Sequence, residues 1–322
     1  MPRALLLGIA LTIVSAFGFG SGALFAKPVY AAGVDWLTLM TWRFTIGAAL
    51  SLGFVVATGR RRAALRAMDR RSVLVAGALG VLYTGNASTY FAGLETVPVS
   101  LAALIVYVYP AIVAVLSIRL GRRLEGRRAW GALGLALAGV ALAVGNIETA
   151  TAPPVGGLLL IAASPVIYSF WIVLSARLAG ERRSGVGHGA EAGSDPLALG
   201  AVMMSATALA YWIGSLATGR PVLPSQIPAA AWSGIAGIGL VATFIAIQAF
   251  YAGAHRMGAA RASLVSTVEP VWTIVLAGIL FHETLSPIQL VGGAMILAGV
   301  VLAQTGPSGA AVSATELRIA DE

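Results

Sequence analysis

Apolar runs of about 20 residues, separated by short segments rich in arginine, repeat along the whole chain. A run of this length is what a helix needs to cross the hydrocarbon core of a bilayer. Backbone polar groups in lipid must be satisfied within the structure, so we predict helices and not open strands. We therefore expect an all-α integral membrane protein with ten transmembrane helices. The predicted spans are residues 4–26, 34–57, 72–92, 97–119, 129–146, 155–176, 197–217, 231–252, 259–281 and 287–304.

The cationic residues alternate between the two sides of these spans. Sixteen of them lie in the connections that follow even-numbered spans, whereas the connections after odd-numbered spans hold only Lys27 and Arg220. Because positively charged connections remain in the cytoplasm, both termini are predicted to be cytoplasmic. We interpret the first apolar run as a retained helix and not as a signal peptide. Heavy use of Ala, Gly and Arg favours a bacterial inner (plasma) membrane as the location.

The chain contains an internal repeat. Residues 92–143 align without a gap on residues 252–303, and 15 of the 52 positions are identical. Pro110 and Pro270 coincide in this alignment, and each is followed 29 residues later by a glycine. Five spans in each half would place the second copy upside down relative to the first. Inverted repeats of this kind are typical of secondary transporters that bind their substrate near the membrane midplane.

The repeat predicts how the chain is divided. We expect a first five-helix repeat in residues 1–146 and a second in residues 155–304. Residues 177–196 are rich in glycine and mixed in charge, which favours a flexible cytoplasmic linker. Residues 305–322 are polar and are expected to form a disordered tail.

Composition excludes several classes of function. Hydrophobic residues make up 58% of the chain and charged residues 11%, a balance that does not suit a soluble domain. The net charge of +8 comes from short arginine runs and not from one basic face, so no nucleic-acid partner is expected. The chain has no cysteine, and its three histidines are far apart, so we predict no metal site. Without a Gly-Lys-Ser/Thr sequence, ATP hydrolysis is not expected, and we predict neither a cofactor nor catalytic residues.

Several short motifs, taken in order, resemble the EamA-type transporters of the drug/metabolite transporter superfamily over residues 4–304. They are Lys27, Trp42-Arg43-Phe44, the segment from Val97 through Pro110 to Glu125, Glu269-Pro270-Val271-Trp272, Glu283, Gly292-Gly293 and Gly299-Val300. The two copies differ by a small insertion, because the proline and the following glutamate are 15 residues apart in one and 13 in the other. The resemblance implies transport, with export of amino acids, other metabolites or drugs, and it does not select among them.

Two ionisable residues, Arg43 and Glu269, lie deep inside predicted spans. A charge at the bilayer centre costs ~2.5–3.5 kcal/mol on insertion scales, so each needs a partner or water. One interpretation is that one or both bind a charged or zwitterionic substrate in a central cavity. The alternatives are a structural ion pair, or an Arg43 side chain that extends to the membrane surface. A buried carboxylate can also exchange a proton, which makes proton coupling a hypothesis.

Other residues near mid-depth are candidates for the same cavity. Aromatic rings and amides can line a wet cavity, or they can serve helix packing and lipid contact. The two prolines remove a helical donor and free the carbonyl groups of Val106 and Ser266, which predicts either hinges or fixed bends. The candidates are Tyr83, Asn86, Tyr107, Tyr109, Tyr168, Trp171, Gln248 and Trp272, with Pro110 and Pro270 as hinges.

The expected function is secondary transport, with export of amino acids or related small metabolites by alternating access of two inverted repeats around a midplane cavity. The expected partners are a small-molecule substrate and membrane lipid, and ten spans suffice for a monomeric pathway. A membrane-embedded lipid-modifying enzyme would need clustered acids or histidines at an interface. A sensor or assembly protein that does not transport would need a large soluble segment, and a channel would not need a duplication.

Overall fold

The computed structural model describes residues 3–118, 126–145, 152–178, 195–257, 262 and 265–304, and every regular element in them is helical. The first half contains α1 (Arg3–Gly20), α2 (Gly22–Ala31), α3 (Trp36–Ala57), α4 (Gly59–Arg66), α5 (Arg70–Leu94), α6 (Val99–Val106), α7 (Tyr109–Ile118) and α8 (Gly126–Gly145). The second half contains α9 (Val155–Leu178), α10 (Pro196–Ala217), α11 (Trp232–Gly239), α12 (Ala246–Met257), α14 (Val268–Phe281) and α15 (Pro287–Gln304). A π-helical turn, Leu240–Ile245, joins α11 to α12.

Length and composition identify helices that can cross a membrane. Five helical stretches are long and apolar enough: Leu5–Ala31, Trp36–Ala57, Val155–Ser175, Leu197–Ala217 and Ala229–Ala254. Four shorter apolar helices cover Val99–Val113, Trp130–Ala143, Val268–Phe281 and Pro287–Leu302. The chain is therefore a multi-pass membrane protein, as predicted, whereas the number of spans stays a prediction.

Some predicted features lie outside the described residues. They include most of the linker 177–196, the tail 305–322 and one end of each of the spans 97–119, 129–146 and 259–281. The same is true of Arg119, Arg122, Arg123, Glu125, Arg182, Arg183, His188 and Arg261.

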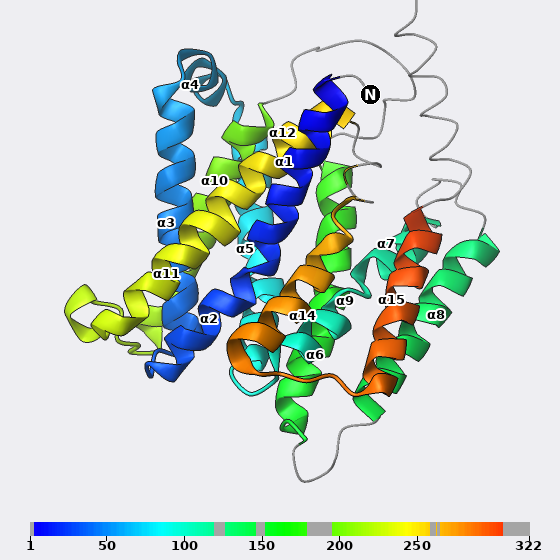
Figure 1. The fold of residues 1–322 in the computed structure, drawn as a ribbon. Coiled ribbons are helices and arrows are strands. Elements are labelled where there is room, and N and C mark those ends of the chain that lie inside the picture. The colour runs from blue at the N-terminus through cyan, green and yellow to red at the C-terminus, as the bar shows by residue number, and fades with distance from the viewer. Residues whose placement is uncertain are drawn as a thin grey trace, which may run out of the picture.

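The helices pack in pairs that join the two halves of the chain. The most extensive contacts are between α8 and α15, α1 and α12, α3 and α10, and α5 and α9. Figure 1 shows α8 and α15 side by side at one edge of the bundle, with α3 at the opposite edge. α4 and the N-terminal end of α1 lie at one end of the bundle, and α2 and the connection from α14 to α15 lie at the other.

Acidic residues begin several of these helices. The Asp35 carboxylate accepts hydrogen bonds from the backbone N–H groups of Leu37 and Thr38, at 2.9 and 3.2 Å, and so begins α3. Asp69 and Asp195 cap α5 and α10 in the same way. An acidic cap satisfies N–H groups that have no partner within the helix, and it complements the helix dipole. These caps fix where the long helices start at the two ends of the bundle.

The first helical stretch is longer than the predicted span 4–26. It is interrupted at Ser21 and continues as α2 to Ala31, so Lys27 lies within a helix. The interruption coincides with a close approach to α14, because a Cβ atom on Gly20 would lie only 2.7 Å from Thr273 Oγ1. Glycine permits this approach, and small residues commonly do so between membrane helices.

The two prolines stand at breaks between helices. α6 ends at Val106 and α7 begins at Tyr109, so Pro110 is the second residue of α7. α14 begins at Val268, so Pro270 is its third residue. The first N–H groups of a helix have no helical partner, and a residue without an N–H group is accommodated there. The interruptions therefore lie where the prolines predicted them.

Candidate functional site

Arg43 is a buried cation in the middle of α3. Its Nε donates a hydrogen bond to Thr243 Oγ1 at 3.0 Å, and its Nη1 lies 3.9 Å from Met40 Sδ. The guanidinium carbon lies 5.0 Å from the ring centre of Phe44 and 4.8 Å from that of Phe91. Each such cation–π contact stabilises a cation by ~0.5–2 kcal/mol, with the larger values where water is excluded. These contacts hold the guanidinium inside the bundle.

Thr243 belongs to the π-helical turn that faces Arg43. Its hydroxyl accepts from Arg43 and also donates to the carbonyl of Ile238, five residues earlier, at 2.9 Å. α3 approaches this turn closely, since a Cβ atom on Gly47 would lie 2.7 Å from Thr243 Cγ2. Single π-helical turns inside α-helices occur frequently at functional sites. The turn therefore positions a hydroxyl where a regular α-helix would not place it.

Arg43 has no acidic partner among the residues that the structure describes. The ion pair that the described residues form joins Arg220 Nε to Asp35 Oδ1, at 3.9 Å. Arg43 and Glu269 therefore do not form the structural ion pair that was one interpretation of the sequence. A guanidinium carries five N–H donors, and only Nε donates to an oxygen in the described part of the chain.

Aromatic rings extend from Arg43 into the bundle. Phe44 lies edge-on to Tyr83 from α5, with ring centres 6.0 Å apart. Tyr83 in turn lies 5.2 Å from Trp171 of α9. Trp171 stacks on Tyr168, one helical turn earlier, at 5.8 Å. Three helices thus contribute rings to one continuous series of ring contacts.

The array continues to the break between α6 and α7. The ring centres of Tyr168 and Tyr109 are 4.9 Å apart, and those of Tyr109 and Tyr107 are 5.8 Å apart. Tyr107 then donates its hydroxyl hydrogen to the carbonyl oxygen of Ser266 at 2.6 Å. Ser266 is the residue whose carbonyl group was predicted to lose its helical partner to Pro270. The same carbonyl accepts the Glu269 N–H at 3.0 Å, so a phenol from the first half adds a second donor at the break in the second half.

Glu269 lies at the Tyr107 end of this array. It is in the first turn of α14 and is half-buried. Its backbone N–H donates to the Ser266 carbonyl, which also accepts from the Tyr107 hydroxyl. The described contacts include no ion pair that joins the Glu269 carboxylate to a cation. We call the whole assembly, from Arg43 through the rings of Phe44, Tyr83, Trp171, Tyr168, Tyr109 and Tyr107 to Glu269, the aromatic array.

Three candidate residues lie elsewhere or serve packing. Asn86 Oδ1 accepts from Ser164 Oγ at 2.8 Å, which links α5 to α9. Trp272 stacks on Phe17 with ring centres 4.0 Å apart, and its Nε1 donates to the hydroxyl of Ser21. These contacts join α14 to α1. Gln248 is half-buried on α12 and is not part of the array.

The structure adds residues that sequence reasoning missed. Thr243 and Phe91 both contact Arg43, and neither was a candidate. A threonine or phenylalanine in an apolar run resembles many other packing residues. A π-helical turn has no known sequence signature, so its position could not be predicted. Phe91 directly precedes Ala92 and Gly93, which open the aligned repeat. This position beside the repeat was the one signal in the sequence that could have made Phe91 a candidate.

Comparison with known proteins agrees with the fold. A sequence model of the EamA-like transporter family matches the chain twice, over residues 6–145 and 155–305. An uncharacterized transporter of Archaeoglobus fulgidus is 29% identical over 308 residues, which are 94% of this chain and 97% of that protein. The uncharacterized transporter YyaM of Bacillus subtilis is 27% identical over 294 residues, 89% of this chain and 90% of YyaM. A protein of known crystal structure shares the fold, with a TM-score of 0.62 and 23% identity over 93% of this chain and 96% of its own.

The helical architecture and these matches define a membrane transporter with two repeats. The chain belongs to the EamA-like transporter family. The predicted resemblance to this family is confirmed. A small-molecule substrate and a lipid environment follow from membership.

Proposed function

We propose that this chain is a secondary transporter that exports amino acids or related small metabolites by alternating access. The substrate would bind along the aromatic array, between Arg43 and Glu269, while two inverted repeats rearrange around it. One observation carries the proposal: Arg43 is a buried cation held by rings and a hydroxyl, with no acidic partner in the described residues. An uncompensated buried charge is strongly unfavourable, and an anionic group of the substrate would compensate it.

The helix pairing supports two inverted repeats. The first span of each half contains α1 or α9, and the third span of each half contains α5 or α12. Exchanging equivalent spans of the two halves therefore replaces α1 by α9 and α5 by α12. The pair α1–α12 then becomes the pair α9–α5, and both are extensive contacts. The pairs α3–α10 and α8–α15 map onto themselves and are also extensive. A twofold axis that relates the two halves would produce this pattern.

The two helix breaks support the same arrangement. Shifting the first half by 160 residues places Pro110 on Pro270 and Tyr109 on Glu269. The helix is interrupted just before this point in both halves. Inverted-repeat transporters commonly build their binding sites from such discontinuous helices. In this proposal the two prolines mark hinges that reshape the site.

The remaining candidates divide between binding and support. Tyr83, Tyr107, Tyr109, Tyr168 and Trp171 would contact the apolar part of a substrate, because aromatic faces combine apolar area with a polar edge. Asn86, Gln248 and Trp272 stay predicted site residues, and the contacts of Asn86 and Trp272 favour support of the neighbouring helices.

The position of α4 supports the proposed orientation. Its run of arginines lies at the same end of the bundle as the start of α1 (Figure 1). Under the positive-inside rule this end is cytoplasmic, as are both termini. Single cysteines placed near Arg62 and Arg122 would be labelled from the same side of the membrane. Labelling from opposite sides would exclude the inverted arrangement.

A counterflow screen in proteoliposomes tests the function directly. Amino acids, sugars and cationic drugs would be compared, and a carrier would show saturable exchange that a channel lacks. Arg43→Ala is expected to reduce the exchange of carboxylate-bearing substrates by at least about tenfold, since truncating one partner of a buried charge pair costs ~2–5 kcal/mol. Arg43→Lys should retain part of the activity. The matched control is Arg62→Ala on the exposed face of α4. If neither Arg43→Ala nor Glu269→Gln changed binding or flux, the proposed site would be wrong.

Proton coupling is part of the proposal and depends on Glu269. Its side chain is half-buried and has no cationic partner in the described part of the chain. A carboxylate in such surroundings can bind and release a proton during transport. Uptake into inside-out vesicles should therefore respond to an imposed pH gradient, and Glu269→Gln should abolish that response. Indifference of the unmodified protein to the gradient would exclude coupling.

A further inference from the structure

The connection between α5 and α6, residues 95–98, lies at the end of the bundle opposite α4. Lys27 of α2 reaches it from within the first half. Its Nζ donates hydrogen bonds to the carbonyl oxygens of Leu94 and Val97, both at 2.9 Å. A lysine near the last carbonyl groups of a helix satisfies acceptors that have no helical partner. Lys27 therefore fastens the end of α5 to α2.

Glu283 reaches the same connection from the second half. It lies between α14 and α15, and its two carboxylate oxygens accept hydrogen bonds from the N–H groups of Val99 and Ser100, at 2.9 and 2.7 Å. The residue before α6 is Pro98, which has no side-chain group to cap the helix. The carboxylate of Glu283 takes this role across the boundary between the halves. A charged acceptor at a helix N-terminus is among the stronger hydrogen-bonding arrangements.

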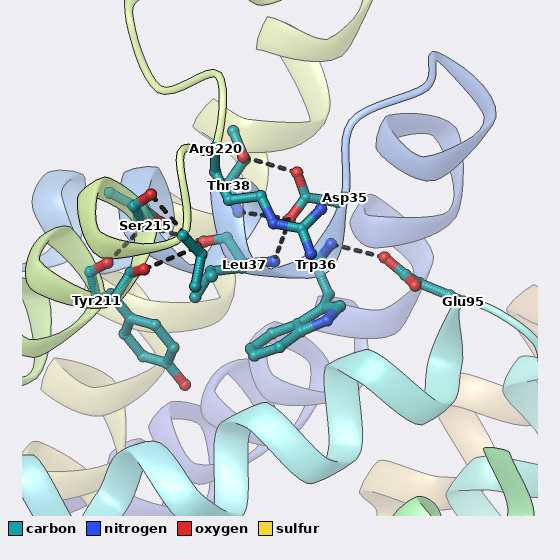
Figure 2. Close-up of polar contacts among 11 residues, drawn as sticks. Asp35, Trp36, Leu37, Thr38, Glu95, Tyr211, Ser215 and Arg220 are labelled. Atoms are coloured by element: carbon teal, nitrogen blue, oxygen red, sulfur yellow. Dashed lines mark hydrogen bonds and ion pairs between the residues drawn. The ribbon is translucent and has the colours of Figure 1, made fainter. Parts of the chain in front are cut away.

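Other bonds tie the connection to the first half. The Tyr30 hydroxyl donates to the carbonyl of Phe91 at 2.9 Å. Figure 2 shows Glu95 pointing towards the start of α3, where its Oε1 accepts from Trp36 N at 2.7 Å. With Lys27, these contacts make α2, α3 and the end of α5 one unit. From the second half, Glu283 bonds to the start of α6, and the backbone of Gly157 in α9 packs against Thr96 and Val97.

A second contact between the halves at this end is weaker. Arg220 lies 3.9 Å from Asp35, whose carboxylate is already occupied by the start of α3 (Figure 2). The Arg220 side chain is 44% exposed, and exposed ion pairs contribute little. Other contacts also join the halves near this end, since Trp42 Nε1 donates to the Val222 carbonyl at 3.0 Å. The bonds made by Glu283 differ from these because they join a charged side chain to the N-terminus of a helix.

We propose that Glu283 is the latch of the gate at this end of the transporter. The inference rests on the proposed alternating access. When this end opens, the Glu283 carboxylate leaves the N-terminus of α6, while Lys27, Tyr30 and Glu95 keep the connection with the first half.

Ser100 provides a reporter beside the latch. Its side chain is 1% exposed, and its hydroxyl has no hydrogen-bond partner among the residues that the structure describes. Ser100→Cys therefore changes the shape little and breaks no side-chain bond. Because the chain contains no cysteine, this thiol would be the single target of a maleimide.

The test measures how fast a membrane-impermeant maleimide reaches this thiol in right-side-out vesicles. Glu283→Ala should raise the labelling rate about tenfold, because it removes two hydrogen bonds to a charged group and a loss of about 1.4 kcal/mol is a factor of ten. Glu283→Gln should give a smaller rise, because its amide oxygen still accepts one N–H group. The matched control Glu95→Ala, which breaks a bond within the first half, should leave the rate within about twofold.

Two outcomes overturn the latch. One is an unchanged labelling rate in a Glu283→Gln protein that remains monodisperse in gel filtration. If Glu283→Ala fails to fold, the labelling rate of Glu283→Gln alone tests the latch. The other is an equal rise with Glu95→Ala. Counterflow with the same proteins separates the two proposals. Normal counterflow with unchanged labelling removes the latch alone, whereas raised labelling without saturable counterflow of any substrate removes the proposed function and retains the latch.

Discussion

The α8–α15 pair and the region around the breaks before α7 and α14 are both built from equivalent parts of the two halves. They differ in how those parts are held together. α8 and α15 are continuous, and a Cβ atom on Gly139 or on Gly292 would lie 2.5 Å from the carbonyl oxygen of the other residue. At the breaks, by contrast, Tyr107 donates to the Ser266 carbonyl from the opposite half.

The difference predicts which part of the bundle stays fixed during transport and which part rearranges. Close backbone packing between membrane helices relies on van der Waals contact, which is lost as soon as the helices move apart. A carbonyl oxygen at a helix break can exchange one hydrogen-bond donor for another, because hydroxyl groups and water can both donate to it. We therefore expect α8 and α15 to stay together during transport while contacts at the breaks change.

The largest effect is expected where the fixed pair is broken. Gly139→Ala should lower the melting temperature by about 5 °C, because overpacking costs ~1–3 kcal/mol. The measurement is thermal unfolding in detergent, followed by loss of the monodisperse peak. Gly134→Ala is the matched control on the same helix, since nothing lies within 4 Å of a Cβ atom there, and it should be neutral or slightly stabilising. Equal melting temperatures for the two variants would mean that the pair is not tightly packed.

A smaller effect on stability is expected at the breaks. Tyr107→Phe keeps the ring beside Tyr109 and removes the hydrogen bond to Ser266, at a cost of ~0.5–1.5 kcal/mol. Counterflow should change several-fold in rate, while the melting temperature falls by only about 2 °C. The control is Tyr109→Phe, because the described side-chain contacts of Tyr109 are made through its ring. If both variants exchanged substrate at the same rate, the Tyr107 hydroxyl would have no part in the rearrangement.

The smallest effect is expected at Glu95, in the connection that leads towards the first break. Partial burial raises the pKa of the Glu95 carboxyl, and the nearby charge of Asp35 adds to the rise. A raised pKa in the folded protein means that Glu95 favours folding at low pH and loses this contribution as the pH rises through its folded value. Glu95→Gln keeps an acceptor for Trp36 N and should raise the melting temperature by about 1 °C at pH 7 and not at pH 4. A lower melting temperature at pH 7 would show that the charge is worth more as a cap than it costs in burial.

Much of the architecture follows from the order of apolar runs, because lipid leaves few alternatives to a helix. Pro110 and Pro270 located the breaks, since a missing N–H group acts on its own helix. The aromatic candidates Tyr83, Tyr168 and Trp171 do come together. Their mutual packing depends on α5 lying along α9, which no local pattern specifies.

What could not be predicted are the contacts between distant segments. Lys27 and Glu283 were recognised as family motifs, yet their convergence on one connection depends on the packing of both halves. Trp272 had the same features as the array residues and instead stacks on Phe17. A side chain's direction around its helix axis is set by its neighbours, and mid-depth position alone does not reveal it.

The equivalence of Tyr109 and Glu269 has a consequence for the two faces of the membrane. A duplicated ancestor with the same residue in both copies would meet its substrate identically from either side. Here one copy offers a phenol and the other a carboxylate, so the inward-open and outward-open forms would differ in affinity. The half-saturation concentration would then differ between the two sides, although the final distribution of an uncoupled substrate would still be set by its gradient alone.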